Sequence, residues 1–73
     1  SPVDWRRLSK IFESEGWKYS RTKGDHLIYI KEDFVRPVVI PMYREIPTFI
    51  IQNNLQTARI SRKDYLKLLE KIK

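Results

Sequence analysis

The chain has 73 residues, with 15 Lys and Arg against 9 Asp and Glu, and a formal net charge of +6. A chain this short is expected to form one domain over residues 1–73, with no room for a large cofactor cleft beside its core, and its positive charge favours an anionic partner such as nucleic acid, a membrane surface or an acidic protein. It contains no cysteine, which excludes disulfides, thiolate nucleophiles and cysteine zinc sites and suits a reducing cytoplasm.

A helix is predicted at the start of the chain. Ser1 suits a helix cap, Pro2 suits the first helical position, and Asp4 completes the spacing of a capping box. Gly16 is expected to end the helix in a left-handed conformation. Apolar side chains recur at helical spacing at Trp5, Leu8, Ile11 and Phe12.

Three strands are predicted next. Residues 17–22 alternate in character, which places Trp17, Tyr19 and Arg21 on one face. Residues 23–25 form a short turn, residues 26–31 a second strand paired as an antiparallel hairpin, and residues 35–40 a third strand with Pro37 near its start.

Two further helices complete the chain. Pro47 is expected near the first position of one helix, and Ser61, with Asp64 at capping-box spacing, starts the other. Their apolar positions are Phe49, Ile50, Ile51, Leu55 and Ala58, and then Tyr65, Leu68, Leu69 and Ile72. The order α-β-β-β-α-α predicts an α+β fold of two layers, in which helices cover one face of a three-stranded antiparallel sheet. No apolar run approaches the roughly 20 residues that span a bilayer, so we expect no membrane association.

His26 is the only histidine of the chain and begins a strand after Gly24-Asp25. Alternation places it on the same side as Ile28 and Ile30, and if that side faces the helices, His26 lies at the rim of the core. An imidazole there suits general acid–base chemistry, whereas the ordinary alternative is a surface histidine of a hairpin.

Other catalytic patterns are missing. The acidic residues near His26 have no recognised metal-ligand spacing, and the chain has no P-loop, dinucleotide-binding glycine pattern or serine-hydrolase elbow. We therefore expect no metal and no small-molecule cofactor.

The basic residues fall into two groups. One group lies on the sheet and its loops, mixed with tyrosines that could stack on bases, and comprises Lys18, Arg21, Lys23, Arg36 and Arg44. The other group, from Arg59 to Lys73, is better explained as the solvated face of the last helix. The first group predicts nucleic-acid binding beside His26.

The segment 21–29, Arg-Thr-Lys-Gly-Asp-His-Leu-Ile-Tyr, resembles the HicA (YcfA-like) toxin family, in which a Lys-Gly-(Ser/Asp)-His turn leads into a strand. The similarity extends to almost the whole chain. Its other segments are Leu8, Phe12 and Gly16-Trp17, then Val38-Val39-Ile40-Pro41, Ile46-Pro47, Phe49-Ile50-Ile51, Asn54-Leu55, Ala58 and Ile60-Ser61-Arg62. The chain departs from the pattern at Asp25, where many members have Ser, and at Leu27 and Met42, where a second histidine is often found.

The resemblance implies a fold like that of a double-stranded-RNA-binding domain and the toxin role of a type II toxin–antitoxin system. It implies ribosome-independent mRNA cleavage, with His26 as the catalytic residue, and a HicB-like antitoxin partner that covers the active site. We expect a metal-independent, cytoplasmic endoribonuclease that binds mRNA through Lys18, Arg21, Lys23, Gly24, Asp25, Arg36, Tyr43 and Arg44.

Two other functions remain open from the residues. A basic domain of this fold could bind RNA without cutting it, and its positive face could instead meet an acidic protein. In the cleavage hypothesis His26 is the general base on the 2′-hydroxyl or the general acid on the leaving 5′-oxygen. The opposite proton role falls to water, a lysine, a tyrosine or Asp25.

Overall fold

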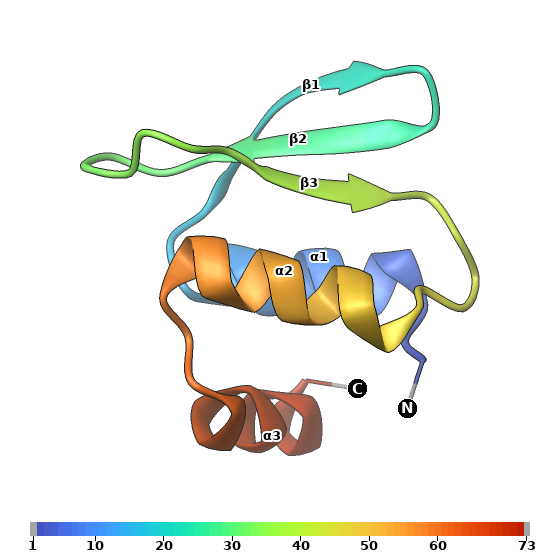
Figure 1. The fold of residues 1–73 in the computed structure, drawn as a ribbon, viewed down its shortest axis with the longest axis vertical. Coiled ribbons are helices and arrows are strands. Elements are labelled where there is room, and N and C mark those ends of the chain that lie inside the picture. Colours follow the sequence, from blue (N-terminus) through green and yellow to red (C-terminus); the bar gives the residue numbers. More distant parts are fainter. Residues whose placement is uncertain (1, 73) are drawn as a thin grey trace.

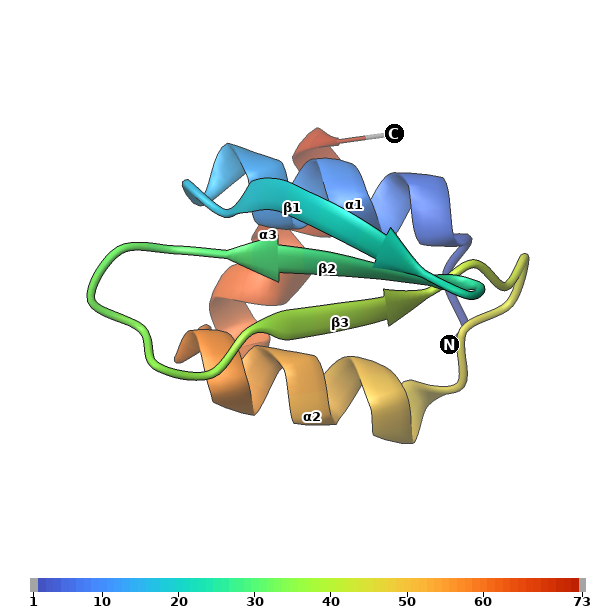
Figure 2. The same ribbon diagram turned by 90° about the horizontal axis from the view of Figure 1, so that it is seen from above.

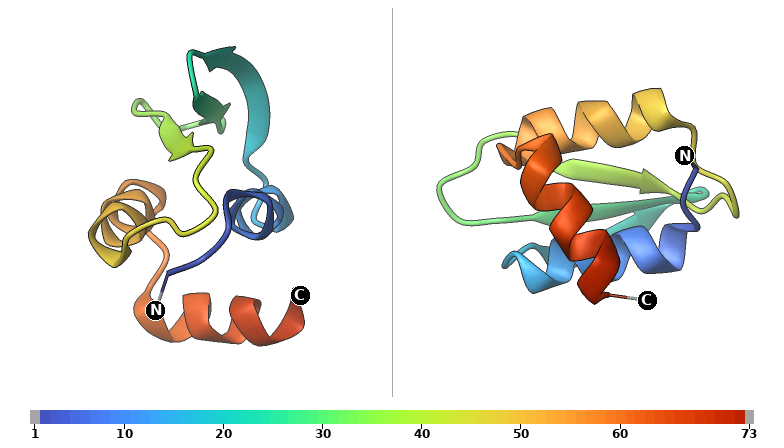
Figure 3. Two further views of the ribbon diagram at one scale, coloured as in Figure 1. Left: turned by 90° about the vertical axis from the view of Figure 1, so that its right-hand side faces the viewer. Right: turned by 90° about the horizontal axis from the view of Figure 1, so that it is seen from below.

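The computed structural model describes residues 2–72 and has the predicted α-β-β-β-α-α order (Figure 1). The elements are α1 (Trp5–Ser14), β1 (Lys18–Lys23), β2 (His26–Ile30), β3 (Val38–Pro41), α2 (Thr48–Ala58) and α3 (Arg62–Lys71). The strands form one antiparallel sheet in the order β1-β2-β3. All three helices lie on the same side of it, with α1 and α2 beneath the sheet and α3 beneath those two helices (Figures 1 and 3). The predicted α+β class is confirmed.

Helix α1 begins later than the sequence suggested. Its N-cap is Asp4, whose side chain accepts a hydrogen bond of 2.8 Å from the backbone N–H of Arg6. The prediction that Pro2 opens the helix is wrong, because the chain is still extended at Val3, which pairs with Ile46 in an isolated β-bridge. The predicted cap, Ser1, lies outside the described residues.

The end of α1 follows the prediction. Gly16 adopts a φ of +94°, its N–H donates to the Glu13 carbonyl, and the N–H of Trp17 donates to the Phe12 carbonyl. These two bonds form a Schellman motif. The Trp17 ring also packs edge-on against Phe12, with centroids 6.4 Å apart, so the turn that ends the helix also anchors the chain where it enters the sheet.

Strands β1 and β2 form the predicted hairpin, but β1 contains a bulge. Tyr19 pairs with Tyr29, whereas Arg21 pairs with Ile28, so Ser20 is an extra residue between the two pairs. The prediction that Tyr19 and Arg21 share a face is wrong, because an extra residue reverses the alternation of side chains beyond it.

Strand β3 is shorter than predicted and starts at Val38. Val35 is fully exposed, and residues 35 and 36 form a bend that lies outside the sheet. Pro37 has no N–H to donate to a neighbouring strand, which explains why pairing begins only after it. Pro41 is the last paired residue, opposite His26.

The core lies between the sheet and helices α1 and α2. Leu27 and Tyr29 of β2 belong to it, together with Val38 and Ile40 of β3, which pair with them. The helices contribute Leu8, Ile11 and Phe12 from α1 and Ile51, Leu55 and Ala58 from α2. The face of the sheet that carries Leu27 and Tyr29 therefore faces the helices, and we call the opposite face the open face.

Helix α2 is fixed to the edge of the sheet by Asn54. This residue is buried, and its side-chain amide donates to the Val39 carbonyl at 3.1 Å. The bond satisfies a carbonyl on the free edge of β3. Phe49 was predicted to belong to the apolar side of this helix, but 63% of it is exposed. Its position is two residues before Ile51, which at about 100° per residue places it on the far side of the helix.

Helix α3 begins as predicted, with the side chain of Ser61 accepting from the backbone N–H of Asp64 at 3.1 Å. At its other end, the Arg7 guanidinium of α1 donates to the carbonyls of Leu69 and Ile72, which ties the end of α3 to α1. Tyr65 is buried between α3 and the rest of the chain. None of the helices within residues 2–72 has the length and apolar character needed to cross a bilayer.

Candidate functional site

The turn between β1 and β2 positions the candidate catalytic residue. Lys23 and His26 are paired across the strands, leaving Gly24 and Asp25 as a two-residue loop. Gly24 has a φ of +62° and is the only residue of this loop with a positive φ, which is the pattern of a type II′ turn. The backbone N–H of Met42 donates to the Asp25 carbonyl at 2.8 Å, so the loop is also held by the chain that follows β3.

Asp25 and His26 interact directly. Nδ1 of the imidazole lies 2.7 Å from Oδ1 of the carboxylate, and the two side chains are 42% and 65% exposed, respectively. The nearby carboxylate favours a proton on Nδ1, which leaves Nε2 as the nitrogen available to a ligand. The pair provides one oriented, solvent-accessible group that can accept or donate a proton.

His26 lies on the open face. It alternates with Leu27, which faces the helices, and so shares its side of β2 with Ile28 and Ile30, as predicted. The possibility that this side faces the helices is wrong, and His26 is therefore not at the rim of the core. Its position gives a large ligand access from the side of the sheet that no helix covers (Figure 2).

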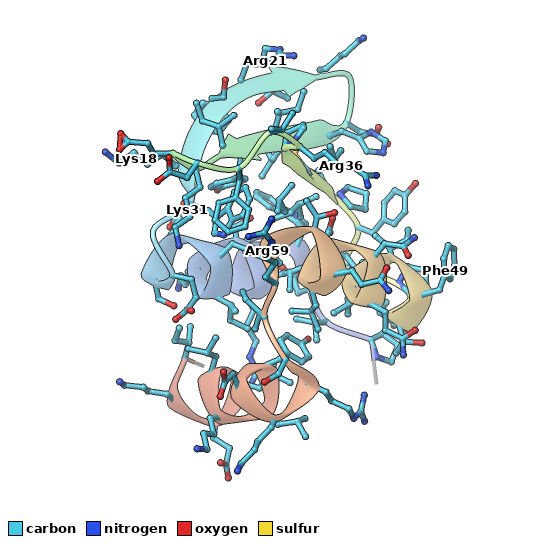
Figure 4. The ribbon with its side chains drawn as sticks, turned by 60° about the vertical axis from the view of Figure 1, so that its left-hand side comes forward. Lys18, Arg21, Lys31, Arg36, Phe49 and Arg59 are labelled. Carbon is cyan, nitrogen blue, oxygen red and sulfur yellow. The ribbon has the colours of Figure 1, made fainter. Side chains whose placement is uncertain are left out.

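The bulge at Ser20 brings three cations to the same face. Residues that pair directly across antiparallel strands project from the same side. Lys18 pairs with Ile30, Arg21 with Ile28 and Lys23 with His26, so all three basic side chains belong to the open face. Figure 4 shows Arg21 at the outer side of the sheet, away from the helices, and Lys18 near the other end of β1.

The loop after β3 lies at the same end of the sheet as His26. It is fixed there by the bond from Met42 to Asp25 and by the Tyr43 carbonyl, which accepts from the backbone N–H of Trp5 at 3.0 Å. Tyr43 and Arg44 are both exposed. The structure therefore brings Lys23, Gly24, Asp25, Tyr43 and Arg44 to the end of the sheet that carries His26.

Two predicted RNA-binding residues lie elsewhere. Lys18 pairs with Ile30, four residues along β2 from His26, which corresponds to about 13 Å. Arg36 precedes β3 at that same distant end and lines a groove with residues of α2, away from the turn. These two residues can only touch parts of a ligand that extends beyond the His26 end.

Within the described residues, the predicted RNA-binding lysines and arginines form no ion pair with an acidic side chain. Within residues 2–72 the ion pairs are Arg6 with Asp4 and His26 with Asp25, and neither involves a lysine or arginine of the open face. Unpaired cations on one face of a chain with a net charge of +6 produce a positive potential there, which attracts polyanions.

A metal site is not evident among residues 2–72. No three side chains of His, Cys, Asp or Glu come together there as a metal site would require.

Sequence reasoning missed three polar residues of α2. Asn53, Gln56 and Thr57 line a groove of about 490 Å³ together with Arg36. The sequence carried no signal for this groove, because it depends on how α2 packs beside the start of β3. Each residue alone is an ordinary exposed or partly exposed position of a helix.

Comparison with known families identifies the chain. A family model described as "HicA toxin of bacterial toxin-antitoxin" matches residues 5–60 of the 73-residue chain, which includes the turn, all three strands and α2. A comparison with curated proteins gave no significant match. The chain belongs to the HicA toxin family of bacterial toxin–antitoxin systems, and this membership implies a toxin role and a cognate antitoxin.

Proposed function

We propose that this toxin is an endoribonuclease that cleaves mRNA without a metal ion and uses His26 for proton transfer. The observation that carries the proposal is the 2.7 Å contact between Nδ1 of His26 and Oδ1 of Asp25, which leaves Nε2 available on the open face. Lys23 and Arg21 project from the same face on the neighbouring strand. Cations beside an oriented imidazole suit a reaction in which negative charge develops on a phosphate.

RNA supplies its own nucleophile for this reaction. The 2′-oxygen attacks the adjacent phosphorus while its proton passes to a base, and the bond from phosphorus to the 5′-oxygen breaks as that oxygen gains a proton. The products are a 2′,3′-cyclic phosphate and a free 5′-hydroxyl. Nε2 of His26 fills one of the two proton roles, and Lys23, with Arg21 or Arg44, stabilises the extra charge on the phosphate oxygens.

The second proton role has several candidates. Tyr43 and Lys23 lie at the His26 end, and water reaches the exposed turn. Asp25 is the weaker candidate, because its carboxylate already lies against Nδ1 of His26. A single imidazole with a less suitable partner implies a slow enzyme, since each well-placed acid or base contributes about 10²- to 10⁴-fold in rate.

The test is cleavage of a labelled single-stranded RNA by the purified chain in the presence of EDTA, beside His26→Ala. We expect the parent to cut and the variant to lose about 10²- to 10⁴-fold in rate, with unchanged far-UV circular dichroism. Analysis of the product ends should find the cyclic phosphate. A variant that cuts as fast as the parent would overturn the role of His26, and loss of the parent's cleavage in EDTA would overturn the metal-free mechanism.

A second candidate is RNA binding without cleavage. It is favoured by the single histidine, because ribonucleases of this type need two proton-transfer groups and only one imidazole is present. The two functions differ in one result: salt-dependent binding with no cleavage at any protein concentration supports the binding module.

The antitoxin is proposed to be a HicB-like protein that covers the open face around His26. The toxin would act on mRNA in the cytoplasm, in keeping with the absence of cysteine. Unpaired Lys23 and Arg21 favour an acidic surface on that partner, which would also speed association. If this is correct, a cognate antitoxin added in equal amount stops cleavage and protects the turn from chemical modification of His26.

A further inference from the structure

We propose that the groove lined by Arg36, Asn53, Gln56 and Thr57 binds a nucleotide of single-stranded RNA and gives the toxin a base preference. The inference rests on the proposed ribonuclease function and adds a specificity site to it. The groove has a volume of about 490 Å³ and lies between the start of β3 and the outer side of α2.

The chemistry of the lining suits a nucleotide. Arg36 offers a planar cation that can bind a phosphate with two hydrogen bonds. Asn53 and Gln56 are three residues apart on α2, so their amides are neighbours on one side of the helix. Each amide presents both a donor and an acceptor, the combination that recognises the edge of an unpaired base. One cation with two adjacent amides can therefore hold the phosphate and the base of the same nucleotide.

The groups in the groove are free to bind. Within residues 2–72, the side chains of Arg36, Asn53, Gln56 and Thr57 take part in none of the hydrogen bonds or ion pairs of the protein. By contrast the neighbouring Asn54 points into the fold and is used to fix α2 to β3. Of the four amides of α2, Asn54 thus has a structural role, whereas Gln52, Asn53 and Gln56 are exposed, and the last two of these line the groove.

The groove is reached from the same side as His26. Figure 2 views the sheet from its open face, and α2 extends beyond the edge of β3 instead of being hidden beneath the sheet. In Figure 4, Arg36 lies beside β3 and above α2. His26 pairs with Pro41 at one end of β3, and Arg36 precedes Val38 at the other end, so the groove lies more than about 10 Å from His26 along the strands. A strand of RNA crossing β3 can reach both places, and the groove would receive a nucleotide beyond those that flank the scissile phosphate.

The lining favours RNA over a protein partner. It contains one cation, two amides and a hydroxyl, and it has neither a carboxylate nor an apolar side chain large enough to anchor a peptide. Protein interfaces depend on buried aromatic or aliphatic anchors, which the groove lacks. Modest base preference through amides is typical of recognition of unpaired RNA.

The experiment measures binding in a His26→Ala background, so that no substrate is consumed. Fluorescence anisotropy of short labelled oligo(A), oligo(C) and oligo(U) gives the ratio of the strongest to the weakest affinity. We expect Asn53→Ala combined with Gln56→Ala to reduce that ratio about tenfold. Arg36→Ala should weaken all three RNAs alike and reduce the slope of log K against log salt by about 0.7. Gln52→Ala is the control, because Gln52 is an exposed amide of the same helix that does not line the groove, although it lines a second depression together with Asn53 and Gln56. The affinity ratio should be unchanged in this variant, and a loss of base preference in it would place the base in that second depression and overturn the groove proposal.

The outcomes separate the groove from the proposed function. If the His26→Ala protein binds RNA but the double variant keeps the parent's affinity ratio, the groove proposal is overturned while the ribonuclease proposal stands. If the double variant instead weakens only the antitoxin complex, the groove belongs to the protein partner and the inference is wrong. If the His26→Ala protein binds no RNA, the proposed function falls, and the groove proposal falls with it.

Discussion

The hydroxyl of Tyr19 lies 2.7 Å from Oγ1 of Thr22, although residues three apart on a regular strand project from opposite faces. The contact exists because the bulge at Ser20 shifts the alternation by one residue. Tyr19 and Thr22 consequently share the side toward the helices, and Lys18, Arg21 and Lys23 share the open face with His26. A single extra residue therefore determines which side of β1 carries its positive charge.

The three cations of β1 are expected to contribute similarly to RNA binding. Replacing Lys18, Arg21 or Lys23 individually with Ala should reduce the slope of log K against log salt by about 0.7, because each removes one phosphate contact and the counterion that it displaces. Lys67→Ala, on the exposed side of α3, is the control and should leave the slope unchanged. Binding titrations at several salt concentrations give the slopes. A Lys18 variant that behaves like the control would show that the ligand does not extend along the whole strand.

Asp25 is expected to position His26. In Asp25→Ala the imidazole loses the partner that orients it, and kcat should fall by about 10- to 100-fold, as misplaced catalytic groups generally cause. KM should fall as well, because a negative charge that repels phosphate is removed. Asp25→Ser is the control, since its hydroxyl oxygen can still accept from Nδ1 and should restore most of kcat. Steady-state kinetics that show only a raised KM in Asp25→Ala would contradict the positioning role.

Gly24 is required by the shape of the turn and not by space. A Cβ at this position would have no neighbour within 4 Å, but the φ of +62° is unfavourable for an L-residue. We expect Gly24→Ala to lower the free energy of unfolding by about 1–2 kcal/mol, measured by urea denaturation. The chain is short enough for chemical synthesis, and D-alanine at the same position should raise stability by about 0.4–1 kcal/mol, because D-residues favour positive φ. Equal effects of the two enantiomers would refute the conformational explanation.

Tyr65 carries a buried hydroxyl that has no hydrogen-bond partner within the described residues. Tyr65→Phe is therefore expected to raise the free energy of unfolding by about 1 kcal/mol. The control is Tyr43→Phe, which removes an exposed hydroxyl and should have little effect.

The same substitution should change the response to alkali. Burial raises the pKa of Tyr65, and the positive charges of Arg7 and Arg62 offset part of that rise. Because the folded state then holds the phenol proton more tightly than the unfolded state, stability is complete below about pH 10 and declines as the pH rises through the folded pKa. Tyr65→Phe should decline less steeply in denaturation experiments above pH 10. Part of the decline should remain, because burial also raises the pKa of Tyr29.

The sequence predicted the elements well where local chemistry decides them. Gly16 ends α1, Ser61 caps α3, and Gly24 with Asp25 forms the hairpin turn, each through bonds to its own neighbours. Predictions that depended on strand pairing were less accurate. The alternation from Trp17 gave no sign of the bulge, and the β-branched Val35 suggested a strand that Pro37 delays.

The candidate site was predicted only as a set of residues. Gly24-Asp25-His26 is contiguous, so its geometry follows from one turn, and Tyr43 and Arg44 join it because β3 runs antiparallel to β2. Which face His26 occupies could not be deduced, since Ile28 and Leu27 are equally apolar and only packing against the helices distinguishes them. Phe49 shows the same limit, because three consecutive apolar residues do not reveal which of them faces the core.

Strand β1 forms one edge of the sheet, and each of its six residues is exposed. An edge of this kind invites a second copy to pair its own β1 with it, which would join the two sheets into one. Lys18, Arg21 and Lys23 oppose that pairing, because two such edges repel each other. Any polyanion that neutralises these charges also removes the barrier to self-association. The toxin is therefore expected to be monodisperse when free, and to associate edge to edge when nucleic acid is present in excess at low salt.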